Sequence, residues 1–193
     1  MRAFTDYNTT QEYTDFKRLP AGAYEVEIIR AEDSDKALCL LFDIRGGEFD
    51  GYFKKKFADD RKSAAVTEPK FKGVYRLWYP NGSEWDDSKK RRMKTALKLI
   101  TEENNLRIDF TREWDGAALK GAKIGMIFQD RQWEYQGKTG WAAQPYGLIS
   151  LGNLRAGEFE IPKPKSLGVA AQSASDSFGY SDAPELTDDD LPF

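Results

Sequence analysis

The strongest constraint on the fold of this chain is a period of two in the apolar residues near its N-terminus. In the segment LPAGAYEVEIIRAE, Tyr24, Val26 and Ile28 alternate with two glutamates. Successive side chains of a β-strand point to opposite faces, so this pattern predicts a strand with one buried and one hydrated face. The segment ALCLLFDIR, residues 37–45, shows the same alternation and predicts a second strand.

Later segments extend this β pattern. The segment YFKKKF, residues 52–57, alternates aromatic and basic residues and predicts a third strand, and residues 71–82 contain a short extended segment that ends in a Pro-Asn-Gly turn. KIGMIF (123–128) and WAAQPYGLISL (141–151) predict two more strands, which the polar aromatic hairpin 129–140 joins. Short strands with many bends favour a small barrel, so we predict a mainly β fold with five strands and one principal helix.

The helix is predicted at residues 86–104. Asp86, Asp87 and Ser88 are candidates for its N-terminal cap, and Asn104-Asn105 for its end. Apolar residues follow at spacings of three, four and seven: Met93, Ala96, Leu97 and Ile100. Residues 115–119 predict a separate helical turn.

From Ile161 onward the chain is rich in Pro, Ser, Ala, Gly and Asp and has no apolar period, which predicts a flexible, disordered tether. We therefore divide the chain into an N-terminal lead-in (1–17), a folded domain (18–164) and an acidic tail (165–193). Six of the 32 acids lie after Lys165, where there is no Lys or Arg, so 26 acids face 29 bases in the rest of the chain. A body of about +3 is thus joined to a tail of about −6. Such a tail could lie on the body until a polyanion displaces it, or serve only solubility.

Histidine is absent, which excludes imidazole-based catalysis, imidazole metal sites and histidine pH switches. The single cysteine, Cys39, excludes an internal disulfide and a thiolate zinc cluster, and its apolar neighbours predict a small buried side chain. No apolar run approaches the ~20 residues that cross a bilayer, and the first residues lack the apolar stretch of a signal peptide. We therefore predict neither membrane insertion nor export.

Aromatic and basic residues are interleaved at 52–57, 70–79 and 131–135. Single-stranded nucleic acid requires this mixture, because Lys and Arg bind phosphates and flat rings stack on unpaired bases. For phosphate contacts we predict Lys54, Lys55, Lys56, Lys70, Lys72 and Arg76. For base stacking we predict Tyr75, Trp78, Tyr79 and Trp133, with Tyr135 as a further candidate.

Each part of this pattern also has a structural explanation. Small barrels need aromatic cores, and the residues we assign first to the interior are Phe42, Phe53, Phe57 and Phe128. Trp85, Trp114 and Trp141 are assigned structural roles. The basic run KKRRMK, residues 89–94, is either a solvated helix face or a phosphate-contacting ridge, and the sequence does not separate the two.

An enzyme would have to use carboxylates. Asp59-Asp60, or Glu84 with Asp86 and Asp87, could hold magnesium for phosphodiester cleavage, but these acids show no ligand spacing. Neither GxxxxGK[ST] nor GxGxxG is present, so no nucleotide-binding loop is visible. We predict no catalytic residues, no metal and no cofactor.

The last six residues, DDDLPF, resemble the acidic C-terminal tip of bacterial and phage single-stranded DNA-binding proteins. Asp188, Asp189 and Asp190 match its acids, Leu191 its aliphatic position, and Pro192-Phe193 its end. In that family the terminal Phe ring enters an apolar pocket on replication and repair enzymes, its free carboxylate meets a basic residue, and the aspartates meet a basic ridge. The resemblance therefore implies that Asp188 to Phe193 bind protein partners.

The body is similar to phage-encoded single-stranded DNA-binding proteins with an OB fold, a five-stranded barrel, through LPAGAYEVEI, GEFDGYFKKKF, LKGAKIGMIF and LRAGEFEIPK. This resemblance spans roughly residues 18–165. It implies a non-catalytic protein that coats single-stranded DNA during phage replication or recombination in the cytoplasm of a bacterial host. A strand-annealing or RNA-binding module and, from another class, a metal-dependent nuclease are the alternatives. Self-association is left open.

Overall fold

The computed structural model describes residues 17–63, 66–135 and 137–167. The predictions for most of the lead-in, for the tail from residue 168 and for the DDDLPF tip (Asp188, Asp189, Asp190, Leu191, Pro192 and Phe193) lie outside the described residues. The predicted folded domain, 18–164, lies within these ranges except for residues 64, 65 and 136.

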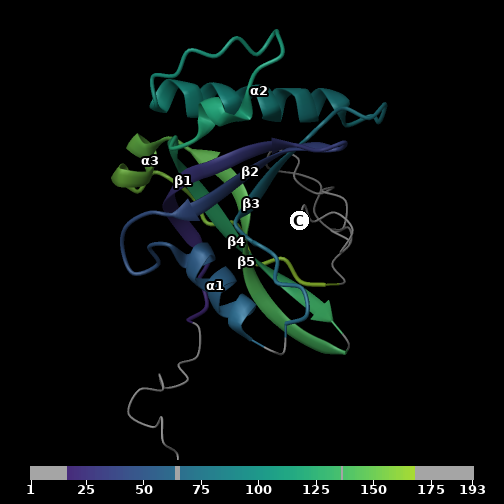
Figure 1. Ribbon diagram of the computed structural model, residues 1–193, viewed down its shortest axis with the longest axis vertical. Coiled ribbons are helices and arrows are strands. Elements are labelled where there is room, and N and C mark those ends of the chain that lie inside the picture. The colour runs from purple at the N-terminus through teal and green to yellow at the C-terminus, as the bar shows by residue number, and fades with distance from the viewer. Residues whose placement is uncertain (1–16, 64–65, 136, 168–193) are drawn as a thin grey trace, which may run out of the picture.

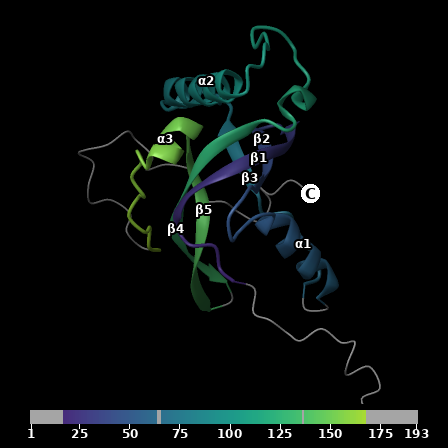
Figure 2. The same cartoon turned by 90° about the vertical axis from the view of Figure 1, so that its left-hand side faces the viewer.

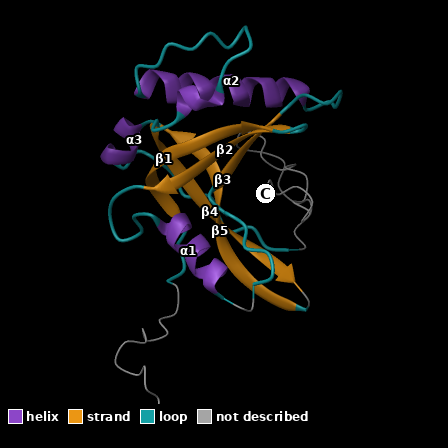
Figure 3. Ribbon diagram, viewed as in Figure 1, coloured by secondary structure: helices purple, strands orange, loops and turns teal. Residues whose placement is uncertain are grey.

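The centre of the fold is a five-stranded antiparallel sheet with the strand order β3-β2-β1-β4-β5 (Figures 1 and 3). Its strands are β1 (Gly22–Asp33), β2 (Ala37–Ile44), β3 (Val74–Trp78), β4 (Lys123–Tyr135) and β5 (Lys138–Ile149). The predictions of strands at the start of the chain, at 37–45, at 123–128 and at 141–151 are confirmed. β4 and β5 are longer than predicted because most of the hairpin 129–140 belongs to the strands, and this hairpin projects beyond the rest of the sheet (Figure 1).

The sheet does not close. Within the described residues β3 and β5 are edge strands, and no backbone pairing joins them. The predicted closed barrel is therefore corrected to an open, strongly paired sheet, while the mainly β class is confirmed. The reason is the shortness of β3, which spans only Val74–Trp78 and pairs on one side with β2, and so presents little edge to the longer β5.

The helices are α1 (Tyr52–Lys62), α2 (Asp86–Glu103), α3 (Leu151–Ala156) and the 3₁₀ helix η1 (Gly116–Leu119). The predicted helix at 86–104 and the predicted turn at 115–119 are confirmed; α3 was not predicted. α2 and α3 lie at one end of the sheet and α1 lies toward the other (Figures 1 and 2). Among the described helices, none combines the length and the apolar character needed to cross a bilayer.

The predicted third strand at 52–57 is wrong, because these residues begin α1. The cause is a buried carboxylate on β2. Asp43 is 1% exposed and accepts hydrogen bonds from the backbone N–H groups of Phe53 (2.9 Å) and Lys54 (3.2 Å). These N–H groups belong to the first turn of α1, where a helix leaves its donors unpaired. Gly51, in the left-handed region at φ 68°, turns the chain into this cap.

The core lies between the inner face of the sheet and the helices. Phe42, Phe53 and Phe128 are buried as predicted, and Phe53 and Phe128 stack with ring centroids 6.2 Å apart. Phe57 is only partly buried and packs edge-on against Phe71. α2 buries Ala96, Leu97 and Ile100 against this core. Cys39 is buried as predicted, in a small cluster with Ala37 and Val74.

Candidate nucleic-acid interface

A groove of about 640 Å³ lies between the two edge strands, where the sheet is open. β3 and β5 contribute one wall each, and side chains of α1, α2 and β4 complete the groove. Its cationic residues are Arg18, Lys56, Lys72, Arg76, Arg92 and Arg131. Its aromatic residues are Tyr52, Phe53, Phe71, Tyr75, Trp78, Trp133, Trp141 and Tyr146.

No Asp or Glu is among the residues that line this groove. Two of its cations have acidic partners beside it, since Arg18 pairs with Asp130 and Lys56 Nζ lies 3.6 Å from Asp60. Walls of one sign of charge and low polarity focus the electrostatic field into the space between them. The groove is therefore suited to an anion that also carries flat apolar groups.

Residues of β4 reach the groove across β5, because their partners on β5 are small. Trp133 is paired with Gly140, and Arg131 with Ala142. A Cβ placed on Gly140 would lie 2.6 Å from Trp133 Cζ2 and 2.8 Å from Cε2, so the indole lies directly over the glycine. Trp133 nevertheless remains 42% exposed. The register of the hairpin thus packs one side of the Trp133 indole against Gly140 and leaves part of the ring accessible to solvent.

Trp141 lies on the opposite face of the hairpin, because it is paired with Gln132 rather than with Trp133. It is 37% exposed and also lines the groove. Trp78, at the end of β3, packs beside the small cluster of Ala37 and Cys39. Trp78 on β3 and Trp141 on β5 therefore line the same groove from its two edges.

Arg92 is the member of the basic run 89–94 that turns toward the groove. Its Nη2 donates to Tyr75 Oη at 3.3 Å and to the backbone oxygen of Tyr146 at 3.4 Å, and its guanidinium lies 5.7 Å from the centroid of the Tyr75 ring. Lys90, Arg91 and Lys94 are exposed on α2 outside this groove. Of the basic residues in the run, Arg92 alone lines the groove, and its contact with phosphate stays a prediction.

Several cationic side chains lie near one another in the groove. Burial and the neighbouring positive charge of Arg92 lower the pKa of Arg131. Arg76 has its Nη2 buried, and no hydrogen-bond partner for that atom is present in the described part of the chain. A buried donor without an acceptor is costly, and an ordered water or a bound anion could satisfy it.

The structure brings six of the ten predicted nucleic-acid residues into this groove: Lys56, Lys72, Tyr75, Arg76, Trp78 and Trp133. Of these, Tyr75 is only 4% exposed and packs in the core, which leaves little of its ring for stacking.

The other four, Lys54, Lys55, Lys70 and Tyr79, are not among the lining residues. Lys54 and Lys55 lie on the exposed side of α1, where Lys55 Nζ donates to the backbone oxygen of Asp50 at 2.6 Å. Lys70 lies in a separate shallow depression beside Phe57. Tyr79 donates its hydroxyl to Asp33 at 2.6 Å, and burial together with this contact raises the pKa of the phenol.

Sequence reasoning missed Arg18, Arg92, Arg131, Trp141 and Tyr146 as residues of the groove. For Arg131 and Trp141 a signal was present, because small residues at 140 and 142 alternate with larger ones in a segment already predicted to be a hairpin. The position of Arg92 depends on how α2 docks, which its own periodicity does not reveal.

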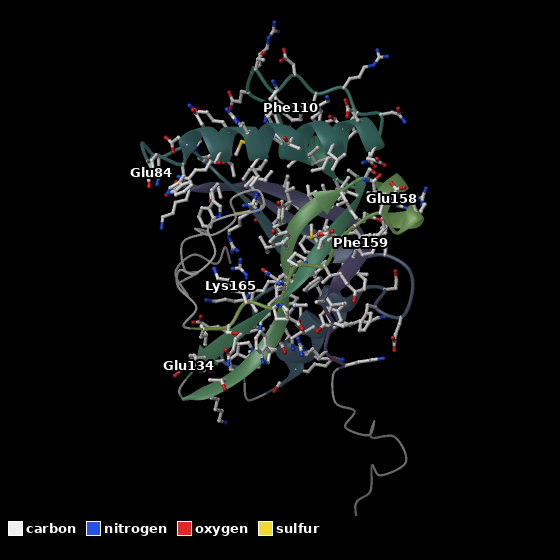
Figure 4. The ribbon with its side chains drawn as sticks, turned by 180° about the vertical axis from the view of Figure 1, so that it is seen from behind. Glu84, Phe110, Glu134, Glu158, Phe159 and Lys165 are labelled. Atoms are coloured by element: carbon white, nitrogen blue, oxygen red, sulfur yellow. The ribbon has the colours of Figure 1, made fainter. Side chains whose placement is uncertain are left out.

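The chain after α3 returns to β4 and supports the hairpin. Lys165 forms a parallel bridge with Arg131, through its N–H to Asp130 O and its C=O to Gln132 N, both at 2.9 Å. Figure 4 shows Lys165 beside the hairpin and Glu134 near its tip. Backbone pairing on this second edge of β4 stiffens the arm that carries Trp133.

Two of the five acids considered as metal ligands, Asp60 and Asp86, have contacts within the fold. Asp60 pairs with Lys56 on α1, and Asp86 accepts from the N–H groups of Asn81 (2.9 Å) and Gly82 (2.8 Å), which, with Lys89 and Ser83, lower its pKa to about 2. Within the described ranges no group of three or more His, Cys, Asp or Glu side chains is arranged to hold a metal ion.

Comparison with known proteins gives no further guide, since no protein-family model and no curated protein matches the chain.

Proposed function

We propose that this protein binds single-stranded DNA without sequence preference and without catalysing a reaction on it. The observation that carries the proposal is the groove between β3 and β5, which combines six cations and eight aromatic residues with no acidic lining residue. The cations fit the phosphate backbone and the exposed indoles of Trp133 and Trp141 fit unpaired bases. Each stacked base contributes ~1 to 3 kcal/mol, so two such rings would carry much of the affinity.

The fold supports the same proposal. Five antiparallel strands in the order β3-β2-β1-β4-β5, with a helix between β3 and β4, are consistent with an OB fold that is open at the β3/β5 seam. We interpret the seam as the path of the strand, since a duplex keeps its bases paired inside and offers no free faces to the indoles. The phage origin and the role in replication, recombination or repair rest on the resemblance of the body and the tip.

The tail is proposed to recruit other proteins through Asp188 to Phe193. A chain lacking Phe193 should lose partner enzymes from the host in pull-down experiments and keep its affinity for DNA. A chain carrying one extra residue after Phe193 should behave alike, because the terminal carboxylate would be displaced from the ring. If the chain lacking Phe193 lost DNA binding and partner binding equally, the proposal that the groove binds DNA and the tail binds proteins would be refuted.

DNA binding is tested by titrating the full chain with oligothymidine and following tryptophan fluorescence. Quenching that reverses with salt is expected, with log affinity falling against log salt by a slope of about −0.7 per phosphate contacted. Oligouridine and duplex DNA at the same salt concentration distinguish an RNA-binding or annealing module. Labelled DNA incubated with magnesium or manganese would show products if the protein were a nuclease.

A matched pair of double variants locates the interface. K72A/R76A removes two charges from the groove, and K54A/K55A removes two charges from the exposed side of α1. The first should lower the salt slope by about 1.4, for two lost phosphate contacts, and weaken binding, whereas the second should change both little. Equal effects of the two variants would mean that the groove is not the binding surface.

A further inference from the structure

We propose that the groove contains a preformed seat for a single phosphate group, made by Arg131 beside Arg92 with Arg76 as a further donor. The inference deepens the proposed function, because it states that one backbone phosphate is held at a fixed place rather than in a diffuse positive field. The same chemistry would accept a free phosphate or pyrophosphate.

Arg131 is held in the groove by a side-chain contact. Its Nε donates to Gln129 Oε1 at 3.5 Å, and Gln129, only 9% exposed, is itself fixed by donating from Nε2 to the backbone oxygen of Lys163 at 2.7 Å. This contact is neutral and uses only the inner nitrogen of the guanidinium. Among the described residues no hydrogen bond of the terminal nitrogens of Arg131 is found, and these nitrogens form the fork that binds oxyanions bidentately.

Arg131 and Arg92 both line the groove. Partial burial, and then the positive charge of Arg92, disfavour the charged form of Arg131 and lower its pKa. No carboxylate lines the groove to compensate Arg131. Arginine stays protonated in proteins, so the repulsion is not relieved by loss of a proton. An anion bound beside the two guanidinium groups would reduce this repulsion.

Arg76 lies on the opposite wall of the groove. Its Nη2 is buried and lacks an acceptor among residues 17–63, 66–135 and 137–167. Diffuse attraction of DNA needs only hydrated lysines at a rim, whereas partly buried, planar guanidinium groups suit an oxyanion at a defined position. Once a phosphate is fixed there, Trp133 and Trp141 meet the flanking bases in a fixed register.

The test compares R131M and R131K with K94M, which removes a charge from the exposed side of α2. In the absence of ligand, R131M should raise Tm relative to wild type, because it removes a partly buried cation near another cation, and K94M should leave Tm unchanged. Pyrophosphate should raise the Tm of wild type and K94M above its value in sodium chloride of equal ionic strength, and should not do so for R131M.

Oligothymidine separates this inference from the proposed function. R131K keeps the charge and loses the fork, so its affinity should fall about tenfold while its salt slope stays that of wild type. Wild-type affinity in R131K, a lower Tm in R131M, or no effect of pyrophosphate on wild type would each overturn the seat. If wild type did not bind oligothymidine but pyrophosphate raised its Tm and not that of R131M, the phosphate seat would be supported and the proposed DNA binding would be refuted.

Discussion

Gly140 should control DNA binding without touching DNA, by deciding where the Trp133 indole lies. A Cβ at position 140 would come within 2.6 Å of Trp133 Cζ2, 2.8 Å of Cε2 and 3.1 Å of Nε1. Carbon atoms in contact are normally about 3.5 to 4.0 Å apart, so in G140A the ring must move by roughly 1 Å or rotate away. Because Trp133 is 42% exposed, it can do so toward solvent with little disturbance of the core.

The size of the effect follows from the stacking that is lost. One base stacked on an aromatic ring contributes about 1 to 3 kcal/mol, which corresponds to about a 5- to 150-fold loss of affinity for oligothymidine. Stability should not fall, because replacing glycine by alanine within a strand favours the strand by roughly 0.5 to 1 kcal/mol. G140A should thus weaken binding while its Tm stays at or above that of wild type.

The assay is a double-mutant cycle of G140A and W133A, measured by fluorescence anisotropy of labelled oligothymidine. If Gly140 acts through the indole, G140A has no effect once Trp133 is removed. G152A is the matched control, because a Cβ there would meet only Ser150 Oγ at 3.7 Å. Wild-type affinity in G140A, or additive losses in the double variant, would refute the reasoning.

Three further changes test the fold around the site. D43N should lower the free energy of unfolding in urea by about 1 to 3 kcal/mol, because the amide cannot replace a buried carboxylate that accepts from Phe53 and Lys54; unchanged stability would contradict its role as the cap of α1. Y79F should lower the free energy of unfolding by about 1 kcal/mol, because it lacks the hydroxyl that donates to Asp33, and it should keep its DNA affinity. A loss of DNA affinity in Y79F would indicate that Tyr79 contacts the DNA. Asp86 has a pKa of about 2 in the fold against 3.8 ordinarily, so its carboxylate stabilises the protein above about pH 4, and this contribution disappears as pH falls through 2. D86N should therefore lower Tm at pH 7 and match wild type near pH 2. A Tm difference that is the same at both pH values would contradict this role of Asp86.

Prediction from sequence succeeded where one short pattern determines one element. The alternation at Tyr24, Val26 and Ile28 and the helical spacing at Met93 to Ile100 are each confirmed, because burial of one face requires the pattern locally. It failed at 52–57, where alternating aromatic and basic residues suit either a strand or a helix. The helix there is favoured by Asp43, nine residues earlier, whose carboxylate accepts from the first turn of α1 only because the fold places β2 beside that turn.

The residues of the groove could likewise be predicted only where a local sequence pattern contains them. Lys72, Arg76 and Trp78 were predicted because they lie in one interleaved segment, and they reach the groove from one edge strand. Arg131 and Arg92 come from β4 and α2, and their proximity depends on strand register and helix docking that no local pattern encodes.

The open seam explains why these distant residues meet. Had β3 paired with β5, the edge backbone would be satisfied and the side chains of both strands would diverge around a closed barrel. With the seam open, Arg76 on one edge and the hairpin residues on the other line a single space. The small partners Gly140 and Ala142 then allow the long side chains of β4 to cross β5 into it. The departure from a closed barrel is thus the feature that creates the groove, and a substitution that fills the small position 140 should displace the Trp133 indole from the groove while leaving the strand pairing intact.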